Sequence, residues 1–154
     1  MDNEIRLKKF IQIKEYAKNF FVMKNYDISR HKYLQSIALC NVKEEISTLY
    51  SNMAMCSIKS EMWEQGFDDV QNAISYSRGS DQNPQIMIKM KYRLAVVLAN
   101  LREYEQAKNI LKHLKKYCNL YEQIDLFKQT NILFDKMSSL INNLQGKFRL
   151  QTII

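Results

Sequence analysis

The sequence predicts an all-α protein, an array of three helix pairs followed by one capping helix. Only three glycines and one proline interrupt the 154 residues, so long helices are allowed almost everywhere along the chain. A small residue and an aromatic residue recur together in three stretches, as they do in internal repeats. Apolar residues also recur at spacings of three and four, which is typical of amphipathic helices.

Each repeat contains an alanine, an aromatic residue nine positions later, and a second small residue three positions after that. The sets are Ala17, Tyr26 and Ser29; Ala54, Trp63 and Gly66; and Ala95, Tyr104 and Ala107. Small side chains at these positions would let two helices approach closely, and the aromatic ring would fill the turn between them. We therefore interpret each set as one helix pair.

The expected helix pairs cover residues 6–23 with 26–39, 45–60 with 62–77, and 85–101 with 103–117, giving repeats at about 9–40, 45–78 and 85–117. Gly79 and Pro84 mark the loop before the third pair, and Pro84 suits the first turn of the next helix. An apolar stripe predicts a capping helix over about 120–145, which would cover the end of the stack. Gly146 is expected to end that helix, so that residues 147–154 form a short tail beyond a domain over 1–146.

Composition excludes several classes of protein. No apolar run approaches 18 residues, and the N-terminus lacks the apolar stretch of a secretory signal. Cys40, Cys56 and Cys118 are odd in number and widely spaced, so we expect buried free thiols in the reducing cytosol or nucleus. A net charge of +7 favours an acidic partner, which charge alone does not identify as peptide, nucleic acid or lipid.

Catalysis has little support in the sequence. His31 and His113 stand alone on different expected helices, without a Cys, Asp or Glu at ligand spacing. The chain contains no HExxH helix, no GxSxG turn and no phosphate-binding glycine loop. Adjacent carboxylates, such as Asp68 with Asp69 and Glu44 with Glu45, would point to different sides of a helix. We therefore expect no enzyme, no cofactor and no metal.

Basic side chains form the most informative pattern. Lys14, Asn52, Lys89 and Arg93 occupy matching phases of the first helices of the three expected pairs. Lys18 follows Lys14 by one helical turn, and Arg93 follows Lys89 in the same way. Taken pair by pair, this pattern also fits an ordinary lysine-rich surface. In stacked helix pairs, however, the first helices line the concave side, so these residues should meet in one groove that suits carboxylates.

Residues 8–116 resemble the three-repeat tetratricopeptide domains of chaperone cofactors, which hold acidic chaperone tails in a carboxylate clamp. The spacing between repeats is a little over the 34 residues of a tetratricopeptide unit. The family's lysine falls on Lys14 in QIKEYAKN, its second-repeat asparagine on Asn52 in LYSNMA, and its third-repeat lysine and arginine on Lys89 and Arg93 in IKMKYRLA. The resemblance implies a right-handed superhelix and a binding function.

Two positions depart from the family's pattern. Lys18 stands where the family has an asparagine, and Met53 replaces the basic residue that usually follows the asparagine of repeat two. The resemblance nevertheless implies five clamp residues, Lys14, Lys18, Asn52, Lys89 and Arg93, for the terminal carboxylate and acidic side chains of a Glu-Glu-Val-Asp tail. Phe21, Met55 and Ile58 would form an apolar pocket for the valine of that tail.

The resemblance leads us to expect a monomeric adaptor for the C-terminal peptides of 70 or 90 kDa heat-shock chaperones, with no nucleic-acid or membrane partner. The main alternative is a repeat scaffold that binds another protein segment without a carboxylate clamp. Nucleic-acid binding is a third reading, which the basic charge and nine tyrosines suggest. The aromatic residues, however, fall mostly at packing phases, and no base-stacking motif is present.

Overall fold

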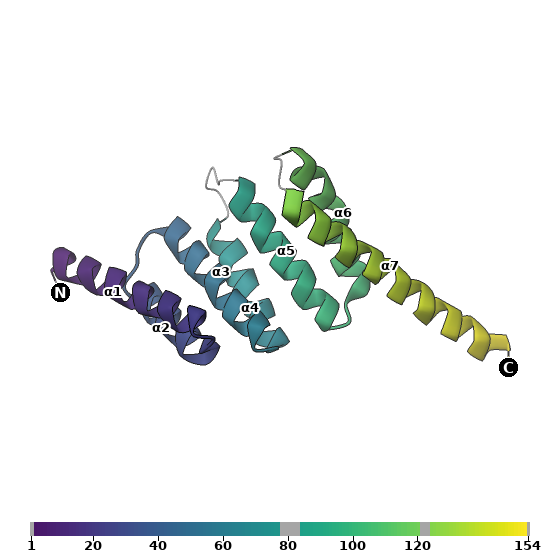
Figure 1. Cartoon of the computed structure of the whole chain (residues 1–154), viewed down its shortest axis with the longest axis horizontal. Helices are drawn as coiled ribbons and strands as arrows, with labels where there is room; N and C mark the ends of the chain where they lie inside the picture. The colour runs from purple at the N-terminus through teal and green to yellow at the C-terminus, as the bar shows by residue number, and fades with distance from the viewer. Residues whose placement is uncertain (1, 78–83, 121–123, 154) are drawn as a thin grey trace. The chain divides into compact units, whose positions relative to one another are not determined.

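A computed structural model of the chain describes residues 2–77, 84–120 and 124–153 and is helical throughout these ranges except at turns (Figure 1). The described helices are α1 Asn3–Val22, α2 Tyr26–Ala38, α3 Lys43–Lys59, α4 Trp63–Ser77, α5 Pro84–Asn100, α6 Tyr104–Leu120 and α7 Ile124–Ile153. The predicted helix pairs are thereby confirmed to within a few residues. Pro84 is the first residue of α5, as its lack of an N–H favours.

The chain divides into two compact units, residues 1–90 and 91–154. The first unit contains α1 to α4 and the beginning of α5, and the second contains the rest of α5 with α6 and α7. Each unit has its own buried residues. The expectation of one domain over residues 1–146 stays a prediction.

All three hairpin turns have the same backbone geometry. The residues with a left-handed conformation are Lys24 (φ 61°), Glu61 (φ 57°) and Arg102 (φ 64°). In the first turn the Asn25 N–H donates to the Phe20 carbonyl at 2.8 Å, and the Lys24 N–H donates to the Phe21 carbonyl at 2.9 Å. Equivalent pairs of hydrogen bonds close the other two turns. This is a Schellman cap, and its left-handed residue lies two residues before the repeated aromatic residue of each pair.

The repeated small residues of the three helix pairs are all buried. Ala17 and Ser29 are fully buried, and the Ser29 hydroxyl donates to the Ala17 carbonyl at 2.7 Å. Ala54 with Gly66, and Ala95 with Ala107, are likewise buried. A larger side chain at Ala17 or Ser29 would separate α1 from α2, so the interpretation of the small residues is confirmed for the first pair.

The core of the first unit joins its first three helices. Its buried members are Ala17, Tyr33, Leu49, Met53 and Cys56. Phe10 and Phe21 of α1 and Tyr50 of α3 are partly buried and pack against this cluster. Because α1 and α3 contribute to the same cluster, their neighbouring faces are held in a defined relation, and these faces carry the candidate site.

In the second unit α7 packs against α6, and Leu111, Leu114, Met137 and Ile141 are buried. The Phe134 ring of α7 makes cation–π contacts with two lysines of α6, with Lys108 Nζ at 5.6 Å and Lys115 Nζ at 4.2 Å from the ring centroid. The final helix is therefore present as predicted. Its predicted end is wrong, because α7 continues through Gly146 to Ile153. A helix tolerates an exposed interior glycine at a cost of about 1 kcal/mol, and good helix formers flank this one.

Two of the three cysteines fall within the described side chains. Cys56 is buried as expected, whereas Cys40 is only half-buried, and both are free thiols. The side chain of Cys118 lies outside the described part. Among the described residues, no helix is both long and apolar enough to cross a membrane, and no three His, Cys, Asp or Glu side chains gather as a metal site would require.

Candidate functional site

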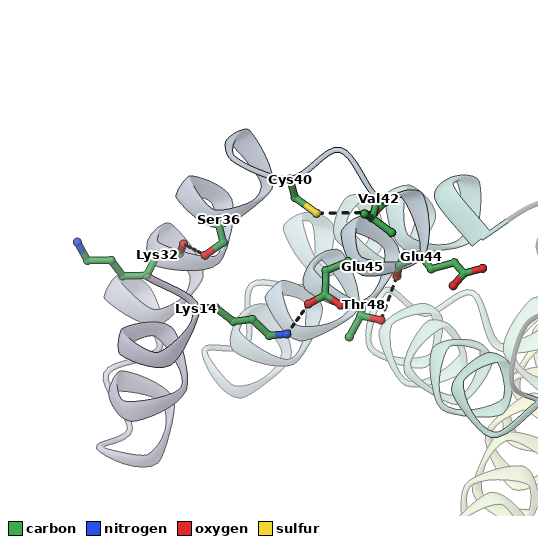
Figure 2. A network of polar contacts seen from close by, with 8 residues as sticks. All are labelled: Lys14, Lys32, Ser36, Cys40, Val42, Glu44, Glu45 and Thr48. Carbon is green, nitrogen blue, oxygen red and sulfur yellow. Dashed lines mark hydrogen bonds and ion pairs between the residues drawn. The ribbon is translucent and has the colours of Figure 1, made fainter. Parts of the chain in front are cut away.

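Lys14 reaches from α1 to the beginning of α3. Its position is set by Ala17, which lies three residues further along α1 in the core, and by Phe10, whose ring centroid is 5.7 Å from the Lys14 ammonium. The ammonium donates a hydrogen bond to the Glu45 carboxylate and forms an ion pair with it (Figure 2). The exposed fractions of the two side chains are 25% and 32%, so water shields the pair only in part. Lys14 thus already binds a carboxylate.

Asn52 shares a face of α3 with Glu45. The two residues are seven positions apart, which is close to two helical turns and about 10 Å along the helix axis. Asn52 is half-buried, next to the core residue Met53. The contact between Lys14 and Glu45 shows that this face of α3 is the one toward which the Lys14 side chain extends. In the structure, however, the Lys14 ammonium lies at the Glu45 end of that face.

Two other cations of the candidate clamp, Lys18 and Lys89, are more accessible than Lys14. Lys18 is exposed and lies one turn after Lys14 on α1. Lys89 is exposed and belongs to the first unit, between the buried residues Ile88 and Met90. The Ser47 hydroxyl of α3 donates its proton to the Ala73 carbonyl at 2.7 Å, and the Met90 sulfur lies 3.6 Å from the same hydroxyl oxygen, so the beginning of α5 contacts α3. Arg93 is half-buried and belongs to the second unit, so its meeting with the other clamp residues stays a prediction.

A hollow of about 470 Å³ lies beside the ion pair. Its lining includes both members of the pair, the cation Arg6 and the apolar side chains Leu7, Phe10 and Val42. Leu7 and Val42 are more than half exposed, so the hollow offers apolar surface to a ligand. It lies between the first half of α1, the loop after α2 and the first turn of α3.

The expected apolar pocket involves residues that have structural roles as well. Phe21 packs against the core cluster and makes an edge-on contact with the Tyr26 ring, with the ring centroids 5.3 Å apart. Met55 and Ile58 are half-buried on α3. A pocket formed by these three side chains for the ligand's valine therefore stays a prediction.

Sequence reasoning missed Glu45 as part of this site. Glu44 and Glu45 do point to different sides, as expected for neighbours on a helix, because Glu44 is exposed and Glu45 is half-buried against Lys14. The available signal was the spacing of seven residues between Glu45 and Asn52, which predicts a shared helix face. The sequence around Glu45 does not indicate that Lys14, 31 residues earlier, would form an ion pair with it.

The fold is similar to three solved domains. The TPR2B domain of yeast Sti1, solved in a complex with pHsp70, has a TM-score of 0.71 and 17% sequence identity, over 86% of this chain and 98% of that chain. The chain has the fold of a tetratricopeptide-repeat (TPR) domain. The second TPR domain of human RPAP3, in complex with the HSP70 peptide SGPTIEEVD, has a TM-score of 0.67 and 20% identity, over 86% of this chain and 98% of that chain. The TPR2AB domain of yeast Sti1, in a complex with pHSP90, has a TM-score of 0.68 and 17% identity, over 85% of this chain and 47% of that chain.

Among curated proteins, part of the sequence of this chain aligns with part of protein unc-45 homolog B. The human protein is 32% identical over 97 residues, which are 63% of this chain and 10% of that protein. The mouse protein is 28% identical over 119 residues, which are 77% of this chain and 12% of that protein. This chain therefore spans about a tenth of the length of these relatives. No protein-family model matches it.

Proposed function

We propose that this TPR domain is an adaptor that binds the acidic C-terminal tails of heat-shock chaperones, of the Glu-Glu-Val-Asp type, in a clamp of Lys14, Lys18, Asn52, Lys89 and Arg93. One observation carries the proposal: the ammonium of Lys14 is held where it binds a carboxylate, that of Glu45. The solved TPR domains that this fold resembles were studied with Hsp70 and Hsp90 partners, one of them a peptide ending in EEVD.

The proposed mechanism is peptide docking without a chemical step, in the cytosol or the nucleus. A terminal aspartate offers an α-carboxylate and a side-chain carboxylate, which suits several cations and an amide, because charge-assisted hydrogen bonds are stronger than neutral ones. The peptide loses conformational entropy on docking, so we expect micromolar affinity, about −8 kcal/mol. Phe21, Met55 and Ile58 are proposed to contact the valine of the tail.

A second candidate function is a TPR scaffold that binds another protein segment without a carboxylate clamp. It is favoured by the same ion pair, because a lysine already neutralised by its own chain attracts an external carboxylate less strongly. The hollow beside Lys14, with its exposed Leu7 and Val42, could then bind apolar side chains of the partner.

Calorimetry with two peptides separates the candidates. A peptide ending in Glu-Glu-Val-Asp should bind with micromolar affinity, and its C-terminal amide should bind at least about tenfold more weakly, because the clamp recognises the terminal charge. Lys14→Met should weaken binding of the acid. Lys9→Met, which removes an exposed lysine from the same helix, should leave it nearly unchanged. Equal affinity for acid and amide, or equal effects of the two substitutions, would refute the clamp.

A further inference from the structure

The ion pair between Lys14 and Glu45 implies more than the presence of a cation. We propose that Glu45 competes with the ligand's carboxylate for Lys14, so that the domain admits only chain ends able to displace or outweigh an internal carboxylate. This inference rests on the proposed function. It adds a residue that determines affinity and specificity and that does not itself belong to the clamp.

The position of Glu45 supports competition. Glu45 is the third residue of α3 and lies about 10 Å along the helix axis from Asn52, the other clamp residue on that face. While Lys14 binds Glu45, its ammonium is directed toward the beginning of α3. For Lys14 and Asn52 to bind the same carboxylate, the lysine ammonium either turns away from Glu45 or is shared between Glu45 and the ligand. Figure 2 shows the Lys14 side chain extended, with its ammonium at the Glu45 carboxylate.

The electrostatics of the site give the same result. A lysine ammonium has three N–H donors, so it could in principle bind two carboxylates at once. A second carboxylate would then lie close to Glu45, in a place where both partners of the pair are less than one-third exposed, and like charges repel there with little screening. Displacement loses one ion pair, and sharing introduces repulsion. In either case Glu45 lowers the affinity for an anionic ligand.

Competition also defines the class of ligand. Glu45 is part of the same chain, so its contact with Lys14 costs no association entropy, whereas an external carboxylate has to pay that cost. A ligand with one carboxylate would replace the Glu45 ion pair of Lys14 with an equivalent one, so the exchange would add little binding free energy. A chain end with at least two neighbouring carboxylates could also engage the exposed Lys18, one turn further along α1. The second carboxylate of such a ligand therefore offsets part of the cost of displacing Glu45.

The test compares two isosteric substitutions of neighbouring glutamates. Glu45→Gln removes the competitor, and Glu44→Gln removes the same charge from an exposed residue of the same first turn of α3. Both lose the same favourable interaction with the helix N-terminus. For the acid peptide ending in Glu-Glu-Val-Asp, Glu45→Gln should bind about two- to fivefold tighter than Glu44→Gln. In a Lys14→Met background that ratio should fall to one.

A second measurement follows the displaced group itself. The ¹³C signal of the Glu45 carboxylate should shift on addition of the acid peptide, because Glu45 loses or shares its cation, and the C-terminal amide should cause a smaller shift. If the protein binds the acid peptide more tightly than the amide but the two glutamine variants bind it equally, then Glu45 does not compete for Lys14, and the clamp proposal is still supported. Weaker binding by Glu45→Gln would mean that Glu45 positions Lys14, which also overturns the proposal. If wild type and Glu45→Gln fail to distinguish acid from amide, both proposals are wrong.

Discussion

Arg30 of α2 binds Asp69 of α4 through two parallel hydrogen bonds. Its Nε lies 3.0 Å from one carboxylate oxygen and its Nη2 lies 2.8 Å from the other. The Ser57 hydroxyl of α3 donates a third hydrogen bond to this carboxylate at 2.8 Å. Asp69 is only 2% exposed, so one buried carboxylate ties together three successive helices of the first unit.

Replacing this carboxylate should destabilise the first unit. In Asp69→Ala the Arg30 guanidinium and the Ser57 hydroxyl lose their partner, and a buried charge left unpaired is costly. Because the Arg30 side chain is 22% exposed and can regain some water, we expect the free energy of unfolding to fall by about 2–3 kcal/mol. Urea denaturation measures the change. The neighbouring substitution Asp68→Ala, at an exposed position, should cost less than about 0.5 kcal/mol, and equal losses would contradict the role of the network.

The turn after α1 should be improved by glycine. Lys24 has a φ of 61°, a conformation that costs an L-residue about 1–2 kcal/mol and a glycine almost nothing. Lys24→Gly should therefore raise the free energy of unfolding by about 0.5–1 kcal/mol, after allowance for the greater freedom of glycine in the unfolded chain. Lys9→Gly, in the interior of α1, makes the same chemical change in a right-handed helix and should lower it by about 1 kcal/mol. Two changes of the same sign would show that the turn is not strained.

Stability should decrease at alkaline pH. Burial, the largest cause, raises the pKa of the Cys56 thiol above its ordinary value of 9.0, and the hydrogen bond with Ser29 offsets this only in part. The folded state thus keeps the proton at pH values where the unfolded chain releases it, so stability is fully present below pH 9.0 and is lost as the pH rises further. Burial also raises the pKa of Tyr50 and of Tyr92 above 10.0, which extends the decrease.

Urea denaturation at a series of pH values from 8 to 11 measures this loss. Cys56→Ser and Cys56→Ala carry no thiol, so their stability should decrease less steeply with pH than that of the wild type. Both substitutions change the packing of a residue that is 1% exposed, but that cost is the same at every pH. Parallel curves for the wild type and both variants would refute the contribution of Cys56.

The helices and turns could be predicted because their causes are local. Ala17 and Tyr26 are nine residues apart, and the turn at Lys24 lies between them, so one short pattern determines where two helices meet. The same reasoning failed at Gly146. A glycine often follows the last residue of a helix, but its cost inside a helix is small enough for the flanking residues to outweigh. The sequence pattern predicts which residue types favour the end of a helix. Whether the helix ends there depends on the balance between the cost of the glycine and the helix propensity of the residues around it.

The candidate site could be predicted only in part. The matching phases of Lys14 and Asn52 place them on first helices, and the structure bears out that placement on α1 and α3. The partner of Lys14 is Glu45, and the partner of Arg30 is Asp69, 39 residues away. Neither pair follows a sequence period, because each depends on how two packed helices are rotated and on which rotamer a long side chain adopts.

Periodicity and residue size along the chain alone determine that this protein forms helix pairs, where its three hairpins turn, and which of its residues are small enough for close packing. These features depend on residues within a single helix, or within one helix pair, as Ala17 and Ser29 show. Tertiary structure decided which charges meet. Lys14 has a carboxylate partner in its own chain because the packing of α1 against α3 brings Glu45 within its reach, and the Coulomb energy of a pair depends on distance in space and on burial, whatever the separation in sequence.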